Sequence, residues 1–524
     1  MNKFFRMTNL EEIGNTKWID SFSFSLYSSQ TYFLRKFQQP TSQISTLLSQ
    51  RNPIEKIKEN LQTNRDPICD TSLQQIQRLE SHLETLKVKP EDWEEESLKQ
   101  LAFTEEWSKP FNGIPYVLPI TAYYKSFIVP FFAVLIPLIS WILPYVVVRL
   151  FFHIPMTFQT YMNMMIGLWL GSDLESFSWS SLELWKQMKY LFQGGWFVFG
   201  LYQAISQPLQ QSAHVRKLDK QIVEKGIELR SCFLAIEEFL ARVGILRGKE
   251  IPCPYLAPIL EITEPRELYI QCRENQKDIQ WILQAVAQGE VEYKLAIHED
   301  LCFVDYKQST FPYLKLKEFY DPSISKEKRV KSNLRMVNTE TQHVLLTGPN
   351  QGGKSSILRA LYVNCLLAQT FGIAFAKSMK LRPFDWIETG LRLADRPGEV
   401  SLFERELEFA SHVLQKTKQK KKIGLLLYDE AFHSTNPPDG EKTARIFMNH
   451  LWACPNVMTF ISTHVFSLVE TAPNTIKRMC VPAYKVENGI DYTFQLRPGL
   501  CKVSSVEELY KKQKFPMYAV DLRG

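Results

Sequence analysis

The distribution of apolar and charged positions divides the chain into unlike regions. Up to about residue 115, and again over 211–300, apolar residues recur at helical spacing with charges on the opposite face. From about residue 301 to the end, strand-like and helix-like segments alternate, which predicts an α/β domain. The pattern therefore predicts two amphipathic helical segments followed by an α/β domain.

The region between the two helical segments, residues 116–210, is strongly apolar. Its most apolar uncharged stretch, 126–148, has 23 residues, which is enough to cross a hydrocarbon core of about 30 Å as a helix. Two further stretches, 150–172 and 190–215, contain no Asp, Glu, Lys or Arg. A membrane insert is the favoured interpretation, and a buried helical hairpin in a soluble domain is the alternative.

Composition and net charge exclude few classes of protein. The 524 residues are 45% apolar and 23% charged, with a net charge of +6. This is ordinary for a globular protein, and it permits binding to nucleic acid or anionic lipid without requiring either. The nine cysteines include no Cys-x-x-Cys pair, which favours buried thiols over disulfides or zinc. The N-terminus has no apolar run typical of a signal peptide.

The stretch "TGPNQGGKSS", starting at Thr347, fits the phosphate-loop pattern G-x-x-x-x-G-K-[ST] between a predicted strand and a predicted helix. Such a loop directs backbone N–H groups and a helix N-terminus at an anion. Lys354 is expected to contact the β- and γ-phosphates, and Ser355 to bind Mg²⁺. The predicted ATP-binding residues are Gly348, Pro349, Asn350, Gln351, Gly352, Gly353, Lys354, Ser355 and Ser356.

A second predicted strand, "IGLLLYDE", ends in two carboxylates. Asp429 can hold Mg²⁺ through water, and Glu430 is placed to act as the general base that activates water. The alternative is an acidic strand end that caps the next helix. A third strand ends at Thr463-His464, and His464 could touch the γ-phosphate or the attacking water, or be structural. The sequence thus predicts Mg²⁺-dependent ATP hydrolysis with Lys354, Glu430 and His464 as catalytic residues.

These motifs resemble those of the MutS family, the ATPases of DNA mismatch repair. The family's phosphate loop reads T-G-P-N-M-G-G-K-S, and this chain differs from it only by Gln351 in place of Met. The family's second motif is D-E-x-x-x-x-T-x-x-x-D-G, and the stretch "AFHS" replaces the glycine-rich segment within it. The spacing of that motif is kept by Asp429, Glu430, Thr435, Asp439 and Gly440.

Two further residues take roles from the resemblance alone. The stretch "SLFEREL" from Ser401 looks like the family's signature S-T-F-x-x-E-M, whose serine reaches across a dimer to the partner's nucleotide. Asn333 fits an upstream Asn that the family places near the adenine. The resemblance therefore implies a homodimer with composite ATP sites and with ATP and Mg²⁺ as cofactors.

The resemblance also implies a fold. We expect an α/β P-loop NTPase domain of the MutS/ABC type at the C-terminus (301–524), preceded by an α-helical lever domain. The lever, which resembles the family more weakly, would be built from 1–115 and 211–300. The apolar insert (116–210) stands where the family has its clamp. Because the chain begins at the lever, we expect no mismatch-reading domain.

The two lever parts set a condition on the apolar insert. Both parts would lie on one side of a membrane, the cytosolic side that supplies ATP, so the insert would cross an even number of times. We therefore expect a transmembrane hairpin with spans at about 126–148 and 190–206, and a multi-pass membrane location.

The sequence leaves several function classes open. The first is a membrane-anchored, MutS-like ATPase that acts on DNA as a dimer; DNA comes from the resemblance and is not shown by the residues. The alternative is the same ATPase with a lever that acts on a protein or lipid. An ABC transporter subunit is disfavoured because the chain has no L-S-G-G-Q motif. An inert scaffold is disfavoured because Lys354, Ser355, Asp429 and Glu430 are all present.

Overall fold

The computed structural model describes residues 17–61, 65–85, 92–170, 184–337, 342–391, 401–486 and 489–503. The polypeptide forms two compact units. The first contains Met1–Gln74, Glu238–Pro252 and Leu283–Gly524, and the second contains Gln75–Glu237 and Cys253–Ile282. This division rests on spatial contacts and does not test the four predicted segments, whose boundaries stay a prediction.

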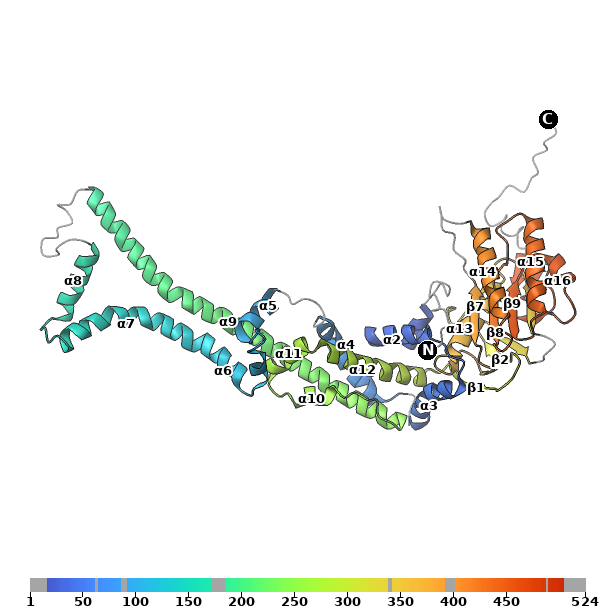
Figure 1. Ribbon diagram of the computed structural model, residues 1–524, viewed down its shortest axis with the longest axis horizontal. Helices are drawn as coiled ribbons and strands as arrows, with labels where there is room; N and C mark the ends of the chain where they lie inside the picture. The colour runs from blue at the N-terminus through green and yellow to red at the C-terminus, as the bar shows by residue number, and fades with distance from the viewer. Residues whose placement is uncertain are drawn as a thin grey trace, which may run out of the picture. The chain divides into compact units, whose positions relative to one another are not determined.

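A six-stranded sheet forms the centre of the C-terminal part of the first unit (Figure 1). Its order is β13-β10-β4-β9-β8-β7, and all neighbours are parallel except β13 and β10. Fully buried parallel strands require near-continuous apolar runs such as "GLLLY". The strands are β4 (His343–Thr347), β7 (Trp386–Gly390), β8 (Gly424–Tyr428), β9 (Val457–Ser462), β10 (Lys477–Cys480) and β13 (Arg497–Pro498).

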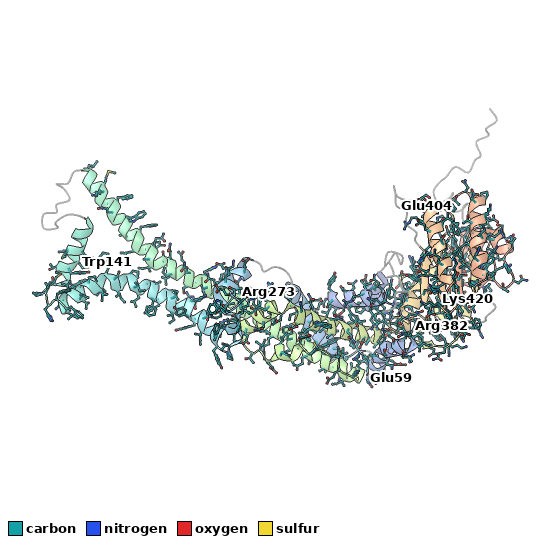
Figure 2. The ribbon with its side chains drawn as sticks, in the orientation of Figure 1. Glu59, Trp141, Arg273, Arg382, Glu404 and Lys420 are labelled. Carbon is teal, nitrogen blue, oxygen red and sulfur yellow. The ribbon has the colours of Figure 1, made fainter. Side chains whose placement is uncertain are left out.

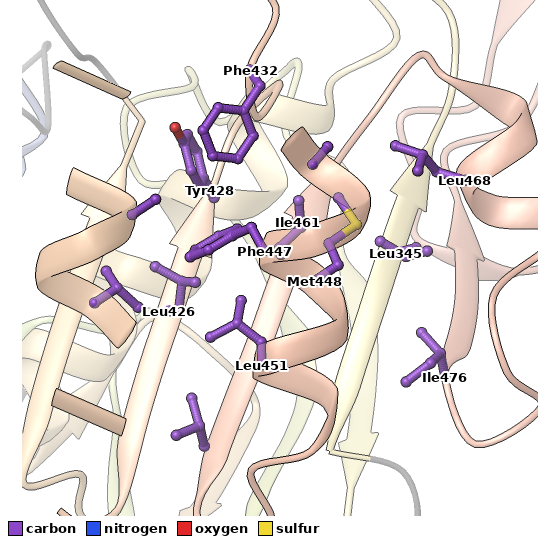
Figure 3. Close-up of a cluster of buried hydrophobic side chains, with 14 of the residues drawn as sticks. Leu345, Leu426, Tyr428, Phe432, Phe447, Met448, Leu451, Ile461, Leu468 and Ile476 are labelled. Carbon is purple, nitrogen blue, oxygen red and sulfur yellow. The ribbon is translucent and has the colours of Figure 1, made fainter. Parts of the chain in front are cut away.

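Helices that follow these strands supply the apolar layer beside the sheet. Figure 3 shows Phe447, Met448 and Leu451 of α15 close to Leu426 of β8 and Ile461 of β9, all within one buried cluster. Burial of this surface holds each helix against the sheet and thereby fixes the loops at the strand ends. The helices are α13 (Lys354–Ala368), α14 (Leu402–Thr417), α15 (Pro437–Trp452) and α16 (Phe466–Glu470).

A second sheet and a hairpin complete the β structure of the first unit. The sheet has the order β3-β2-β6-β1-β5, and β11 pairs with β12 in the hairpin. The strands of this sheet are β1 (Cys302–Tyr306), β2 (Leu314–Phe319), β3 (Ser332–Met336), β5 (Ile373–Ala374) and β6 (Ser378–Leu381). The hairpin strands are β11 (Ala483–Val486) and β12 (Gly489–Tyr492).

The first unit also contains helices from the N-terminal part of the chain. They are η1 (Lys17–Phe22), α2 (Tyr27–Phe37), α3 (Ile44–Asn60) and parts of α4 (Pro67–Thr85) and α12 (Gln276–Ile297). An aromatic cluster joins them to the segment after α13: the ring of Phe33 stacks on that of Phe371 with centroids 4.9 Å apart. Trp18 contacts Phe33 and Phe375 edge-on. Periodicity did not indicate this junction, because it joins residues more than 300 positions apart.

Truncation of Phe33 is expected to destabilise the first unit strongly. Its side chain is fully buried, and Phe33→Ala would leave a cavity in the cluster at a cost of about 3–5 kcal/mol. Denaturant unfolding would measure this loss. Phe311→Ala is the matched control, because Phe311 is 39% exposed. Equal stability of the two variants would contradict the packing described here.

The second unit is helical. Its elements are α5 (Asp92–Leu101), η2 (Lys109–Gly113), α6 (Val117–Tyr123), a π-helical turn η3 (Tyr124–Ile128), α7 (Val129–Leu150), α8 (Phe158–Leu170), most of α9 (Leu184–Arg247), α10 (Leu256–Glu261) and α11 (Pro265–Glu274). α9 packs closely on the start of α11, since a Cβ added at Gly226 would lie 2.1 Å from the Pro265 carbonyl oxygen. The predicted boundary at 210/211 lies inside α9, where a change in composition does not end the helix.

The apolar region has exposed side chains along α7. Phe131, Ile136 and Leu143 are each more than half exposed, and Trp141, labelled on α7 in Figure 2, accepts a hydrogen bond at its carbonyl from the Tyr161 hydroxyl of α8. Among the described residues, one continuous helical stretch is long and apolar enough to cross a membrane. It is Val117–Pro137, which comprises α6, η3 and the first part of α7. It has 21 residues and a mean hydropathy of 1.5, and 17% of its most apolar part is buried.

The part of the chain that the structure describes thus contains fewer candidate spans than the two that the sequence predicted. The one helix overlaps the expected span 126–148, and a shorter apolar helix, Ile139–Leu150, follows it. The expected second span, 190–206, lies within α9 and does not meet the same criterion. A single helix of this kind also occurs as a core helix in soluble proteins. The expected two-span, multi-pass arrangement is therefore not supported by the described residues.

Candidate active site

The phosphate loop connects the end of β4 to the start of α13. Gly353 caps α13 with φ 99°, a conformation that favours glycine. A Cβ there would also lie 3.2 Å from the ring of Phe494. Gln351 also has a positive φ, 64°, so the loop contains a second left-handed position before the helix begins. This backbone places the first N–H groups of α13 at the carboxyl end of the parallel sheet, where ligands of α/β folds bind.

Lys354, the first residue of α13, is buried beneath this loop. Its side chain is 4% exposed, and its ammonium donates to the carbonyl oxygens of Gly348 and Pro349, each 3.1 Å away. Burial lowers its pKa, and the carboxylates of Glu430 and Asp429 act in the opposite sense. The loop therefore wraps around the cation that is predicted to contact the phosphates.

Asp429 and Glu430 follow β8, and the hydroxyl of Ser462 at the end of β9 orients both. This hydroxyl donates to Asp429 Oδ1 at 2.5 Å and accepts from the Glu430 N–H at 2.8 Å. Both acidic residues are half-buried. Sequence reasoning missed Ser462, which stands two residues before His464. The only available signal was its place at the end of a strand beside the predicted carboxylates.

His464 contacts the carboxylate predicted to act as base. Its Nε2 lies 2.8 Å from Glu430 Oε1. The hydrogen bond from His464 is the largest effect that lowers the pKa of Glu430; burial opposes it, and the charges of His464, Lys354 and His433 support it. Glu430 is therefore kept ionised, which is the state that a general base requires. The structure thus brings together the three predicted catalytic residues, Lys354, Glu430 and His464.

A cavity of about 440 Å³ opens beside the phosphate loop. Ile324, Val330, Ile357 and Phe494 give it apolar walls, and Gln351, Gly353 and Ser356 link it to the loop. Asp321 and Lys328 also line it, and a largely apolar cavity with a few polar groups next to a phosphate site suits a nucleobase. Sequence reasoning missed its walls, because they come from separate segments and belong to no motif.

Two of the predicted site residues, Asn333 and Ser401, have hydrogen bonds that the sequence did not predict. Asn333 lies on β3 and does not line this cavity; its side-chain oxygen accepts from the Glu318 N–H at 2.9 Å. Ser401 is the N-cap of α14, and its hydroxyl accepts from the Glu404 N–H at 3.2 Å. Figure 2 labels Glu404 at this end of the helix. The role near the adenine and the role across a dimer both stay predictions.

The donors present suit Mg²⁺ bound together with a nucleotide. Mg²⁺ prefers oxygen ligands and usually keeps water and substrate phosphates in its shell. Ser355, exposed in the first turn of α13, and Asp429, fixed by Ser462, are oxygen donors of this kind. No group of three or more His, Cys, Asp or Glu that could hold a metal occurs in the described ranges.

Comparison with known proteins matches the C-terminal part of the chain. Residues 344–522 match the family model for MutS domain V. The DNA mismatch repair protein MutS of Thermus thermophilus is 31% identical over 179 residues, which cover 34% of this chain and 22% of the relative. The human DNA mismatch repair protein Msh6 is 29% identical over 244 residues, covering 43% and 18%. The chain thus spans about a fifth of the length of these relatives. The C-terminal part of this chain, over residues 344–522, is therefore similar to MutS domain V, an ABC-like ATPase domain.

Proposed function

We propose that the chain is a Mg²⁺-dependent ATPase of the MutS type that works as a dimer with composite ATP sites. The observation that carries the proposal is the hydrogen-bonded sequence from Asp429 through Ser462 and Glu430 to His464, beside the phosphate loop. An ordered carboxylate pair of this kind is what water activation beside a phosphate site requires.

Each part of the site has one task in the proposed reaction. The loop N–H groups and the Lys354 ammonium bind the phosphates and offset the charge that develops on the γ-phosphoryl oxygens. Glu430 accepts a proton from the attacking water, and His464 holds its carboxylate in place. Mg²⁺, held by Ser355 and Asp429, would supply further positive charge at the phosphate oxygens. The products are ADP and phosphate.

Ser401→Ala is expected to lower kcat about 10-fold or more, since a hydrogen bond to a charged group contributes about 1.5–3 kcal/mol. This loss occurs only if Ser401 donates to a nucleotide held by a second copy. Loss of the N-cap alone costs about 1 kcal/mol of stability and would leave kcat unchanged. Steady-state ATPase assays and thermal unfolding separate these effects.

Mixing two impaired variants tests the composite site directly. A dimer of one Ser401→Ala subunit and one Lys354→Ala subunit contains one site with an intact phosphate loop and an intact partner serine. The mixture is therefore expected to regain a measurable part of the wild-type rate. A mixture that shows only the sum of the two variants' rates would contradict the dimer.

We propose DNA as the first candidate for the substrate of the lever, because the matched relatives are named DNA mismatch repair proteins. The basic residues of α9 give limited support. Lys220 and Lys225 lie 3.7 and 3.5 Å from Glu224 and Glu228, and Arg216 lies over the ring of Phe127. ATPase activity with and without duplex DNA over a salt series is the test. Stimulation that falls with salt supports DNA, and a rate indifferent to DNA at every salt concentration contradicts it.

The second candidate is a membrane-attached ATPase whose lever acts on protein or lipid. The exposed apolar face of α6 and α7 favours it: Ile120, Phe131, Ile136 and Leu150 are each more than 60% exposed. Exposed apolar surface of this extent marks an interaction site. Flotation with lipid vesicles in a density gradient tests attachment. Protein that stays monodisperse without detergent and does not float would contradict it.

A further inference from the structure

A buried carboxylate joins α14 to the segment that follows Glu430. Glu406 of α14 is 1% exposed. One of its oxygens accepts a hydrogen bond from the Ser434 hydroxyl, and the other lies 3.4 Å from His433 Nδ1. The same His433 nitrogen lies 2.8 Å from the Glu430 carbonyl oxygen. A buried carboxylate is unfavourable without such partners, so Glu406 holds residues 433 and 434 against α14.

The backbone between these contacts adopts a conformation that non-glycine residues rarely occupy. Glu430 has φ 53° and Phe432 has φ 60°, and such angles persist only where the surroundings impose them. The buried ring of Phe432 packs against Phe403 of α14 with centroids 6.5 Å apart, and against Phe447 at 5.7 Å. α14 thus contacts this segment through an apolar pair and through a carboxylate.

α14 also carries the residue proposed to touch the partner's nucleotide. Ser401 is its N-cap, and Glu406 follows about 7 Å along the helix at 1.5 Å per residue. A hydrogen-bonded helix moves as one body over this distance, so a shift at Ser401 moves Glu406. The two partners of Glu406 lie in "AFHS", the stretch that departs from the resembled family pattern.

We propose that Glu406 is a positioning residue for hydrolysis. Together with His433 and Ser434 it forms a latch, the Glu406 latch, that fixes the backbone at Glu430 and hence the direction of its carboxylate. The latch couples the position of α14, and so the docking of Ser401 on the second nucleotide, to the general base. This inference rests on the proposed function.

The test compares two latch variants with a matched control on the same helix. Glu406→Gln removes the charge at nearly constant volume, and Ser434→Ala removes the hydroxyl donor. Glu408→Gln is the control, because it makes the same Glu-to-Gln change at an exposed position two residues from Glu406. Because misplacement of a catalytic group by about 1 Å costs about 100-fold, both latch variants are expected to lower kcat about 10- to 100-fold. The Kd for ATP should be unchanged, and Glu408→Gln should match the wild type in both quantities.

A double-mutant cycle with Glu430→Gln separates positioning from general structural damage. Once the base is removed its position no longer matters, so Glu406→Gln should lower the residual rate no further. A further fall in that background, with a lower melting temperature, would overturn the latch. So would a kcat of both latch variants equal to that of Glu408→Gln in a chain whose wild-type form hydrolyses ATP. Should Glu406→Gln fail to fold, Ser434→Ala decides the question alone, because its hydroxyl is only half-buried.

The wild-type control distinguishes failure of the latch from failure of the proposed function. A folded wild-type chain without ATPase activity overturns the proposed function and the latch with it. An active wild-type chain with unaffected latch variants overturns the latch alone.

Discussion

Glu430→Gln is expected to lower kcat for ATP hydrolysis by about 100- to 10,000-fold, the range that a positioned general base contributes, while ATP binding is retained. The amide keeps the size of the side chain but cannot accept the proton of the attacking water. The residues expected to hold the phosphates and Mg²⁺, Lys354, Ser355 and Asp429, are unchanged. Single-turnover hydrolysis measured beside equilibrium ATP binding would show bound ATP that is not cleaved.

The control for this variant is Glu470→Gln, which makes the same change at a half-exposed carboxylate paired with Lys502. Surface pairs of this kind contribute little, so its kcat should equal the wild-type value. Hydrolysis by Glu430→Gln at the wild-type rate would show that the base has been assigned to the wrong residue.

Lys354→Ala is expected to weaken ATP binding by about 100-fold or more, corresponding to about 2.8 kcal/mol at 1.4 kcal/mol per tenfold change. The reason is the loss of the buried ammonium enclosed by the phosphate loop. Equilibrium binding of a fluorescent ATP analogue measures the change.

Two control variants test whether the loss of ATP binding comes from the loss of the Lys354 charge. Lys354→Met keeps the packing of the side-chain stem without the charge, so it should bind ATP as poorly as Lys354→Ala. Lys420→Ala removes an exposed lysine after α14 and should bind ATP as the wild type does. Normal affinity in Lys354→Met would show that the charge is not what binds the nucleotide.

Much of the site could be predicted from sequence because its residues stand in continuous motifs. Gly348 to Ser356 form one loop whose geometry follows from the glycines and from the strand and helix beside it. Asp429 and Glu430 directly follow a buried apolar strand. Parallel strands end at the same edge of a sheet, so the juxtaposition of these segments with His464 was also predictable.

The remaining residues could not be predicted, because separate segments bring them together. Phe494 reaches the cavity beside the loop from a segment more than 130 residues after Tyr320. Asn333 lies on β3, where its side-chain oxygen accepts a hydrogen bond from the Glu318 N–H, a contact that its place in the family pattern did not predict. The apolar periodicity around Phe33 and around Phe371 does not indicate that their rings stack. Tertiary contacts between distant residues decide these placements, and a single sequence gives no signal for them.

The prediction of two membrane spans is only partly matched by the helices of the structure. Three apolar stretches and the condition of an even number of crossings predicted two spans, and the second of them, 190–206, is part of a single helix that runs from Leu184 to Arg247. Only Val117–Pro137 among the described helices has the length and apolarity to cross a membrane. The described residues therefore support one candidate span of the two that were expected.

The most direct test of the account is phosphate release from ATP by the purified wild-type chain, measured with Mg²⁺ and with EDTA, against a Lys354→Ala preparation as background. We expect saturable, Mg²⁺-dependent release that is lost in EDTA and lies well above the Lys354→Ala background. A folded wild-type preparation whose release equals that background under both conditions would contradict it.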